Sequence, residues 1–372
     1  MRLAYLSTDP GIPYGGAKGA SVHLAATAEA LAAEENDVLT LVTAIEPGSS
    51  QPHGMTVEVL PGPGRGASTT GRLRFREELA AWLERRLEDF GANALYERLA
   101  LHSAAGATVA KRLGIPHLVE LNAPLLEEAA RYRRLDEPEA AEKLESATLR
   151  GADLVFAVSP PLAAYARARG ASRVEVLQNA AAIERFTPPE RNGACPVAVF
   201  AGSLRPWHGI ETIAQAWRLL GPAAPRLLVV GEGPSGALLR GLAATVTGPV
   251  PPARVPRLLA AAEIGLAPYN TDAPRYFSPL KLFEYLAAGL ATIVADLPAV
   301  TAVVDRDTAV VIPCGDAEAL AEAVAALYAD SSERRRLGEN GRALVEAGHT
   351  WRHRARRILE AAAELAPAAV KT

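Results

Sequence analysis

Cysteine is scarce in this sequence, and charge of one sign is not in excess. The 372 residues include two cysteines, Cys195 and Cys314, which form no CxxC pair. This argues against a disulfide scaffold, a zinc cluster or an iron–sulfur site, and favours two small buried side chains in a reducing cytosol. The formal net charge of −3 creates no overall positive field. Nucleic acid is therefore not an expected partner.

Long apolar segments are also absent. No stretch approaches the ~18 consecutive apolar residues of a membrane span. Asp9, Pro10 and Gly11 cut short the first apolar run, so a signal peptide is not expected. The composition, with 49% hydrophobic and 22% charged residues, is that of a globular chain. We expect a cytoplasmic protein of two domains, since domains average roughly 100–200 residues.

Short aliphatic runs alternate with helical stretches along the chain. The runs are continuously apolar, which is typical of parallel strands covered on both faces. The predicted strands are 3–6, 38–43, 56–60, 94–96, 117–121, 154–158 and 174–177, then 197–201, 227–230, 245–248, 264–267, 292–295 and 310–312. Predicted helices include 22–33, 75–90, 103–113, 210–220, 280–288, 320–328, 334–347 and 352–365.

This alternation predicts an α/β fold of two Rossmann-like βα domains. The segment 187–196, TPPERNGACP, interrupts the pattern and is predicted to be a linker. The predicted parts are an N-terminal domain over 1–186, this linker, a C-terminal domain over 197–350, and a last helix and tail over 351–372. Ligands bind at the carboxyl ends of parallel strands, so we expect the function in the loops after strands, within a cleft between facing domains.

Two glycine-rich loops follow predicted strands. Gly231, Gly233 and Gly236 spell GxGxxG before a predicted helix, but no acidic residue occurs around 245–252, where a dinucleotide site would need one. The pattern indicates either backbone that approaches a ligand or a tight turn without one. The first loop holds Gly15, Gly16 and Lys18 before a helix. It is either an anion-binding loop or a flexible loop with a solvated lysine.

The segment SPLKLFEYLAAG is the most informative part of the chain. Ser278 is predicted to cap a helix with Pro279 at its first position, and Gly289 is predicted to end it. Lys281 and Glu284 are three apart and share one face. They form either a surface ion pair or a functional pair. In the second case Lys281 and the helix N-terminus bind phosphates, and Glu284 accepts hydrogen bonds from a ribose diol.

Further basic residues offer charge to an anion. Arg205 lies in the loop after the first strand of the second half, where a guanidinium can fork onto a diphosphate. His208 is either a ligand or a loop histidine. One basic cluster is predicted either to grip an anionic acceptor or membrane surface or to be solvated: Arg65, Arg72, Arg74 and Arg76. A second cluster is predicted to be a solvated helix face: Arg352, Arg354, Arg356 and Arg357.

In this order and spacing, the motifs resemble those of the family 4 glycosyltransferases, retaining enzymes of the GT-B fold. The resemblance covers nearly the whole chain. It rests on the Gly15-Gly16 loop, VSPPLAAY, VLQNAAAIERF with Asn179 and Phe186, FAGSLRPWHG, VVGEGP, SPLKLFEYLAAG and HTWRHRARRIL. It implies a C-terminal helix that crosses back to the first domain, a nucleotide-sugar donor in the second domain and an acceptor in the first.

The resemblance also assigns individual residues. Glu284 matches the second glutamate of the family's E-x7-E signature, which holds the donor ribose, whereas Tyr276 stands at the first. Ser203 and His208 stand where the family has Arg and Lys in its diphosphate loop, so we expect Arg205 to carry that charge. Ala182 replaces the aspartate of the family's Asn-Gly-Val-Asp.

Two segments of the first half, YERLALHSAAG and LVELNAP, resemble those of one subgroup of the family. They place Glu97, Arg98, Glu120 and Asn122 at strand ends facing the cleft, with hydrogen bonding inside the first domain as the alternative. Together these arguments predict three sets of residues. The catalytic set is Arg205, Lys281, Asn122 and Glu120; the donor-binding set is Gly15, Gly16, His208, Gly231, Gly233, Val250, Ser278, Leu280, Lys281 and Glu284; the acceptor-binding set is Lys18, Glu97, Arg98 and Asn122.

The resulting hypothesis is retaining sugar transfer without a metal ion or cofactor. A UDP- or GDP-sugar is the favoured donor, and the acceptor is a small molecule, a glycan or a lipid-linked molecule. Two alternatives remain at this point. One is a sugar-nucleotide epimerase or hydrolase that uses Glu97 and Glu120 as an acid and a base; the other is a non-catalytic nucleotide-sugar sensor.

Overall fold

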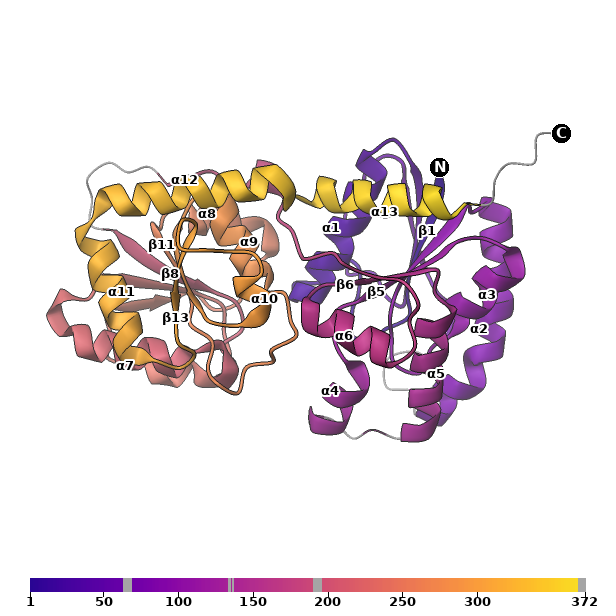
Figure 1. The fold of residues 1–372 in the computed structure, drawn as a ribbon, viewed down its shortest axis with the longest axis horizontal. Coiled ribbons are helices and arrows are strands. Elements are labelled where there is room, and N and C mark those ends of the chain that lie inside the picture. The colour runs from indigo at the N-terminus through magenta and orange to yellow at the C-terminus, as the bar shows by residue number, and fades with distance from the viewer. Residues whose placement is uncertain (63–68, 133–134, 136, 190–195, 367–372) are drawn as a thin grey trace. The chain divides into compact units, whose positions relative to one another are not determined.

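The computed structural model describes residues 1–62, 69–132, 135, 137–189 and 196–366 (Figure 1). The chain forms two compact units. Unit 1 comprises Met1–Gln178 and Trp351–Thr372, and unit 2 comprises Asn179–Thr350. Arg65 and Cys195 lie outside the described residues, as do the side chains of the other arginines in the first basic cluster. The membrane or acceptor role of that cluster therefore stays a prediction.

Unit 1 is built on a parallel sheet of seven strands in the order β3-β2-β1-β4-β5-β6-β7. The strands are β1 (Arg2–Ser7), β2 (Asp37–Val42), β3 (Met55–Val59), β4 (Ala94–Arg98), β5 (His117–Leu121), β6 (Leu154–Ala157) and β7 (Val174–Val176). Its helices are α1 (Gly19–Ala33), α2 (Thr69–Phe90), α3 (Ala105–Leu113), α4 (Leu125–Tyr132), α5 (Pro138–Gly151), α6 (Pro160–Ala168) and α13 (Trp351–Leu365).

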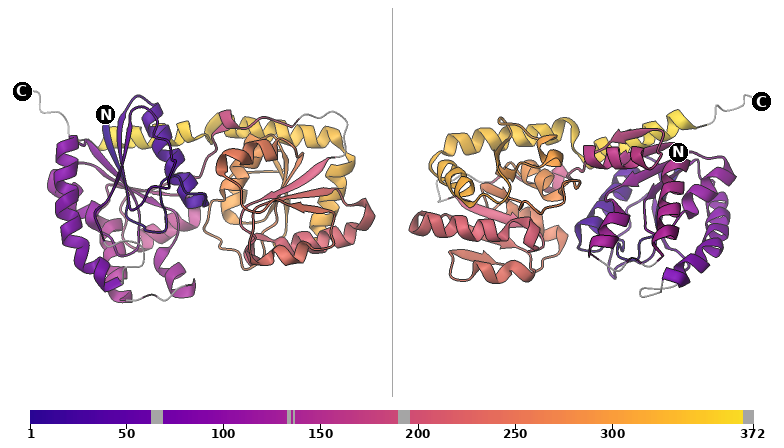
Figure 2. Two further views of the ribbon diagram at one scale, coloured as in Figure 1. Left: turned by 180° about the vertical axis from the view of Figure 1, so that it is seen from behind. Right: turned by 60° about the horizontal axis from the view of Figure 1, so that its bottom comes forward.

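The central strand β1 shows why its sequence is continuously apolar. Leu3 and Tyr5 belong to the core on one face of the sheet, and Ala4 and Leu6 to the core on the other. Successive side chains of a strand point to opposite faces, so a strand covered on both sides needs apolar residues at every position. The continuous runs in the sequence thus predicted a sheet between two helical layers, and each unit shows those layers (Figure 2).

The C-terminal helix belongs to the first unit. Ala355, Ile358 and Ala362 of α13 are buried in the same core as Leu24 and Ala28 of α1. The chain therefore returns to unit 1 after completing unit 2, as the family resemblance implied. In the parts of the chain that the structure describes, no helix is long and apolar enough to cross a membrane.

Unit 2 is built on a parallel sheet of six strands in the order β10-β9-β8-β11-β12-β13. The strands are β8 (Val197–Ala201), β9 (Arg226–Val230), β10 (Ala244–Val246), β11 (Ile264–Ala267), β12 (Ala291–Ala295) and β13 (Ala309–Ile312). The helices are α7 (Ile210–Leu220), α8 (Val255–Leu259), α9 (Leu280–Ala287), α10 (Pro298–Thr301), α11 (Ala317–Ala329) and α12 (Ser331–Gly348).

In both sheets the order in which strands are added reverses at the first strand. After β1 the chain adds β2 and β3 on one side and β4 on the other, and β8 is flanked in the same way by β9 and β11. The loops that leave neighbouring strands at such a switch point diverge, which opens a crevice at the carboxyl ends of the strands. These are the places where each unit is able to hold a ligand.

Two local predictions in unit 2 were wrong. The segment after the GxGxxG motif is a short 3-10 turn, Pro234–Leu239, and not an α-helix, because the first two glycines are used to pack one loop against another, as shown below. Helix α9 begins at Leu280 with Pro279 as its N-cap, and the Ser278 side chain does not cap it. The Ser278 hydroxyl instead accepts a hydrogen bond from a distant backbone amide.

Candidate functional site

The loops after β8 and β9 in unit 2 are joined by backbone hydrogen bonds. The amide of Gly202 donates to Val230 O at 2.9 Å, and the amide of Leu204 donates to Glu232 O at 2.8 Å. A Cβ atom on Gly231 would lie 2.1 Å from Gly202 O, and its φ of +134° already disfavours a side chain. The GxG pattern is therefore required for loop packing. This explains the glycines without a bound dinucleotide.

The ammonium of Lys281 is the most unusual charge in unit 2. The residue is 8% exposed, and its Nζ has no hydrogen-bond partner among the described residues. The ammonium lies 3.8 Å from the centroid of the Phe200 ring, and a Cβ atom added to Gly202 would be 3.1 Å from Nζ. Helix α9 thus directs a cation at the backbone loop that follows the central strand β8.

Burial explains the electrostatics of this lysine and of its neighbour on the helix. Burial lowers the pKa of Lys281 to about 7, with only the Glu284 carboxylate acting in the opposite direction. Burial likewise raises the pKa of Glu284 to about 7, against the charges of Lys281 and Arg185. Within the described part of the chain, neither side chain takes part in an ion pair, so the surface-pair alternative does not describe them. Burial of either charge without an ion-pair partner costs free energy, which an oppositely polarised ligand would offset.

His208 lies beside this lysine in the short turn Pro206–His208. Its Nδ1 is 2.5 Å from Ser203 O, so Nδ1 carries the proton that this carbonyl accepts. Burial, together with the nearby charge of Lys281, lowers the pKa of His208 to about 3. The ring is therefore neutral, and its Nε2 is an acceptor and not a second cation. Arg205, three residues earlier, is exposed and supplies a further charge at the edge of the loop.

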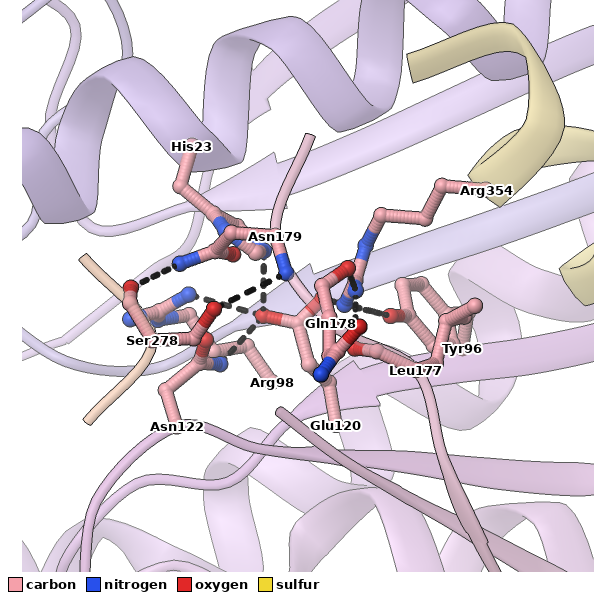
Figure 3. Close-up of polar contacts among 10 residues, drawn as sticks. All are labelled: His23, Tyr96, Arg98, Glu120, Asn122, Leu177, Gln178, Asn179, Ser278 and Arg354. Carbon is pink, nitrogen blue, oxygen red and sulfur yellow. Dashed lines mark hydrogen bonds and ion pairs between the residues drawn. The ribbon is translucent and has the colours of Figure 1, made fainter. Parts of the chain in front are cut away.

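The N-terminus of α9 is fixed by the first residue of unit 2. The Asn179 amide donates to Ser278 Oγ at 3.2 Å, and Asn179 Nδ2 donates to Ser278 O at 2.6 Å. Figure 3 shows both bonds. Leu280, the first residue of α9, is half-buried. The motif asparagine thus positions the helix that carries Lys281 and Glu284.

Other predicted donor residues are more scattered. Val250 is half-buried in the loop after β10, and Gly248 in the same loop bridges to Gly231. Gly15, Gly16 and Lys18 lie in the loop after β1, in unit 1. A cavity of about 400 Å³ in unit 2 has a different lining: Arg185, Thr187, Ala253, Pro256, Arg257 and Ala260. None of the predicted donor residues lines that cavity.

In unit 1, the Glu120 carboxylate at the end of β5 is the centre of a buried polar cluster (Figure 3). Its Oε1 atom lies 2.8 Å from Arg98 Nη1 and 2.8 Å from His23 Nε2. The Asn122 side-chain amide donates to the same oxygen. Three donors therefore converge on one oxygen atom, from the end of β4, from α1 and from the loop after β5.

The other oxygen of Glu120 is held by groups deeper in the unit. Tyr96 Oη donates to Oε2 at 2.5 Å, and Arg354 Nη2 lies 3.1 Å from it. Arg354 also donates through Nη1 to the carbonyls of Leu177, at 2.5 Å, and Gln178, at 2.9 Å. The sequence predicted a solvated position for Arg354, which was wrong: the side chain is 2% exposed. The other three arginines of that helix pair with Glu34 or Glu175.

The charges around Glu120 keep it ionised. Desolvation alone would raise its pKa, but the hydrogen bond from His23 and the charges of Arg354 and Arg98 outweigh it and hold the pKa well below the usual range. Desolvation also lowers the pKa of His23, so this ring is neutral and donates through Nε2–H. Both oxygens of Glu120 are already filled with donors, which leaves no lone pair for a proton from a substrate.

Glu97, predicted to bind the acceptor, points into the interior of unit 1. It is 1% exposed, and its Oε2 lies 2.8 Å from His117 Nε2. A Cβ atom on Gly106 would be 2.1 Å from the same oxygen, so α3 packs directly on this pair. The internal hydrogen bond left open by the sequence is present. Lys18 is exposed and Asn122 is half-buried, so both are able to meet a ligand.

Sequence reasoning missed His23 and Arg354. His23 is one polar residue on the buried face of α1, and such a residue signals an internal partner. Arg354 had no local signal, because its carboxylate partner is 234 residues away in the chain. Among the described residues, no group of three His, Cys, Asp or Glu side chains is arranged to hold a metal ion.

Comparison with known families identifies the class to which these units belong. Residues 18–180 match the family described as Glycosyl transferase 4-like domain, and residues 195–330 match the family Glycosyl transferases group 1. The first match lies in unit 1 apart from residues 179–180, and the second lies in unit 2. The chain therefore belongs to the family 4-like glycosyltransferases of the GT-B type.

Solved structures show the same fold. Sucrose-phosphate synthase from Thermosynechococcus elongatus has a TM-score of 0.75 at 22% identity, with 98% of each chain covered. HepE from Anabaena in complex with UDP-glucose has a TM-score of 0.71 at 16% identity and covers 98% of this chain and 100% of that chain. WaaG, a glycosyltransferase involved in lipopolysaccharide biosynthesis, has a TM-score of 0.69 at 16% identity, with coverage of 99% and 100%. No curated protein matches the sequence significantly. The predicted GT-B fold is confirmed.

Proposed function

We propose that this glycosyltransferase moves a sugar from a nucleoside-diphosphate donor to an acceptor hydroxyl, with retention at C1 and without a metal ion or cofactor. The observation that carries the proposal is the buried Lys281 ammonium, which has no hydrogen-bond partner in the part of unit 2 that the structure describes and faces the Gly202 loop. A cation held in low dielectric without a counter-ion favours an anionic ligand. HepE, a structural neighbour, was solved with UDP and with UDP-glucose, which supports a nucleotide sugar as that ligand.

The chemistry of the transfer needs fixed positive charge. The bond between C1 and the diphosphate oxygen breaks, and the bond between C1 and the acceptor oxygen forms on the same face. The acceptor hydroxyl gives its proton to the departing phosphate oxygen. Negative charge grows on the leaving group, where Lys281 and Arg205 stabilise it without reorganising at the moment of reaction. His208 Nε2, being an acceptor, binds a hydroxyl or phosphate proton. Glu284 accepts the ribose hydroxyls.

Unit 1 supplies the acceptor side in this proposal, through Asn122 and Arg98. The epimerase or hydrolase alternative needs a free acid and a free base. Glu97 and Glu120 do not provide them, because both are buried and hydrogen-bonded inside unit 1. This favours transfer over epimerisation on structural grounds.

The decisive experiment is to incubate the purified chain with UDP-sugars and GDP-sugars, with and without a panel of sugar acceptors. We expect release of the nucleoside diphosphate that depends on acceptor, and an α-linked product from an α-linked donor by NMR. An inverted product would overturn the retaining assignment. Isomerised donor without acceptor would identify an epimerase, and donor binding with no consumption would identify a sensor. Full activity in EDTA is expected, and loss of activity that Mg²⁺ restores would contradict metal independence.

A further inference from the structure

The buried cluster around Glu120 has a layered order of exposure. The side chains of Glu120, Arg354 and His23 are 0%, 2% and 3% exposed, whereas that of Arg98 is 8% exposed and Asn122 is half-buried. Only the outer pair is able to touch a molecule in solution. Any effect of the three inner residues on a substrate must therefore pass through Arg98 and Asn122.

We propose that His23 and Arg354 are positioning residues for acceptor binding, which fix Glu120 so that it orients Arg98 and Asn122. The inference rests on the proposed function, because it assumes that unit 1 binds the acceptor. It assigns to Glu120 a role different from the catalytic one that the sequence predicted.

Arg354 is suited to this role because every contact it makes is to a fixed group. Its Nη1 bonds to the Leu177 and Gln178 carbonyls, and its Nη2 to Glu120 Oε2 and, at 3.3 Å, to Tyr96 Oη. A planar guanidinium whose two terminal nitrogens are both bonded has one orientation. It therefore fixes the plane of the Glu120 carboxylate from the inner side.

His23 fixes the same carboxylate from the outer side. Its ring packs edge-to-face on Trp351, with centroids 5.1 Å apart and an interplanar angle of 87°. Its Nε2 lies 2.8 Å from Glu120 Oε1. The indole at the start of α13 thus holds the ring in the plane that its hydrogen bond requires.

With both oxygens fixed, Glu120 orients the two outer residues. Arg98 donates to Oε1 through Nη1, at 2.8 Å. The guanidinium also has a side-chain hydrogen bond with Tyr5, and its remaining N–H groups are available to an acceptor. Asn122 donates to Oε1 through Nδ2, which leaves its carbonyl oxygen to accept from a sugar hydroxyl. The fixed Glu120 carboxylate thereby sets the orientation in which Arg98 and Asn122 meet an acceptor.

The test compares Arg354→Met, Arg354→Lys and Arg357→Met, assayed for KM of acceptor, KM of donor and kcat. Arg357 lies on the same helix but pairs with the half-buried Glu175, outside the Glu120 cluster, so its variant is the matched control. We expect Arg354→Met to raise the acceptor KM by about 10- to 100-fold, the effect of a small misplacement of binding groups. The donor KM should stay within twofold. Arg354→Lys should recover part of the loss, and Arg357→Met should behave as wild type.

A second variant keeps the inference testable if Arg354→Met does not fold. His23→Phe removes one neutral donor but keeps a ring against Trp351, so no charge is left unpaired. We expect a several-fold rise in acceptor KM with an unchanged donor KM. Equal changes in both KM values, or none in folded variants, would overturn the inference.

Glu120→Gln separates positioning from proton transfer. A general base contributes about 10²- to 10⁴-fold to kcat, so its loss would remove that factor and the acidic limb of the pH profile. We expect instead a raised acceptor KM with the acidic limb in place. The opposite result makes Glu120 the base and overturns the inference.

A readout that needs no activity distinguishes this inference from the proposed function. The side-chain amide resonance of Asn122 should shift in Arg354→Lys and His23→Phe but not in Arg357→Met. If wild type transfers no sugar, the proposed function fails, whereas these shifts still test whether the inner residues orient Asn122. Unchanged Asn122 resonances would overturn the positioning role.

Discussion

The Lys281 ammonium lies 3.8 Å from the centroid of the Phe200 ring. Lys281 belongs to helix α9 and Phe200 to strand β8. The face of an aromatic ring attracts a cation, although by less than a carboxylate does. Phe200 therefore makes burial of the charge tolerable without neutralising it. In the proposed function, the result is an anion site that is assembled before the ligand arrives.

Replacing Lys281 with Met should weaken binding and strengthen the fold. We expect the Kd for UDP to rise by about 10- to 100-fold, since a hydrogen bond to a charged group contributes about 1.5–3 kcal/mol. We expect the Tm without ligand to rise by about 2–4 °C, equivalent to about 1 kcal/mol, because an unpaired buried charge is removed. Calorimetric titration and thermal unfolding measure the two effects.

The control for this variant is Lys143→Met, which removes an exposed charge from α5 and should change neither quantity. The gain in stability should be smaller at pH 10 than at pH 7. Burial lowers the pKa of Lys281 to about 7 in the folded protein, against an ordinary value of 10.5. At pH 7 folding must therefore remove a proton from this lysine or bury its charge. At pH 10 the lysine of the unfolded chain is close to its own pKa, so the same step costs less free energy. A loss of stability in Lys281→Met would contradict this account.

The affinity for UDP should be greatest near pH 7. Above this pH free Lys281 loses its proton, because burial lowers its pKa to about 7, and binding must recover that proton. Below it Glu284 gains a proton, because burial raises its pKa to about 7, and binding to a ribose diol must remove it. Titrations between pH 5.5 and 9 in Lys281→Met should lose the alkaline limb, and those in Glu284→Gln the acidic limb. A flat wild-type profile would contradict both assignments.

Elements with purely local causes were predictable from the sequence. The bounds of β5 and β11 agree with the predicted strands 117–121 and 264–267, because both are short apolar runs buried on both faces. Helix α9 was predicted from its start and stop signals, Ser278-Pro279 and Gly289, but Ser278 was wrongly assigned as its cap. Its hydroxyl accepts instead from Asn179, a residue 99 positions away. In the buried cluster, Arg98, Glu120 and Asn122 were predicted from the family resemblance. The contact of Arg354 was not predicted, because this residue reaches Glu120 only through the return of the chain to unit 1.

His208 should not contribute to the pH dependence. Burial lowers its pKa to about 3, so the ring stays neutral over the whole range of the titration. His208→Asn keeps a donor for Ser203 O and should keep both limbs of the UDP profile. His208→Ala loses that bond, which contributes about 0.5–1.5 kcal/mol, and should weaken UDP binding by about 2- to 10-fold at every pH. A limb that disappears in His208→Asn would show that the histidine titrates.

The loop packing at Gly231 should control both stability and donor binding. Gly231→Ala places a Cβ atom 2.1 Å from Gly202 O, whereas Gly241→Ala, at a φ of +78°, meets no atom within 4 Å. The control therefore carries only the backbone strain of about 1–2 kcal/mol. Gly231→Ala must also displace the Gly202 carbonyl and weaken the two backbone bonds between the loops, each worth about 0.5–1.5 kcal/mol.

We therefore expect urea unfolding to give a loss of about 3 kcal/mol for Gly231→Ala, clearly more than for Gly241→Ala. Because the Gly202 backbone lies against the Lys281 ammonium, only Gly231→Ala should also weaken UDP binding. If the two variants lose stability equally and bind UDP alike, the loops are not coupled as the geometry requires. If Gly231→Ala is stable but binds UDP poorly, the glycine serves close approach to the ligand, which was the other interpretation left open by the GxG pattern.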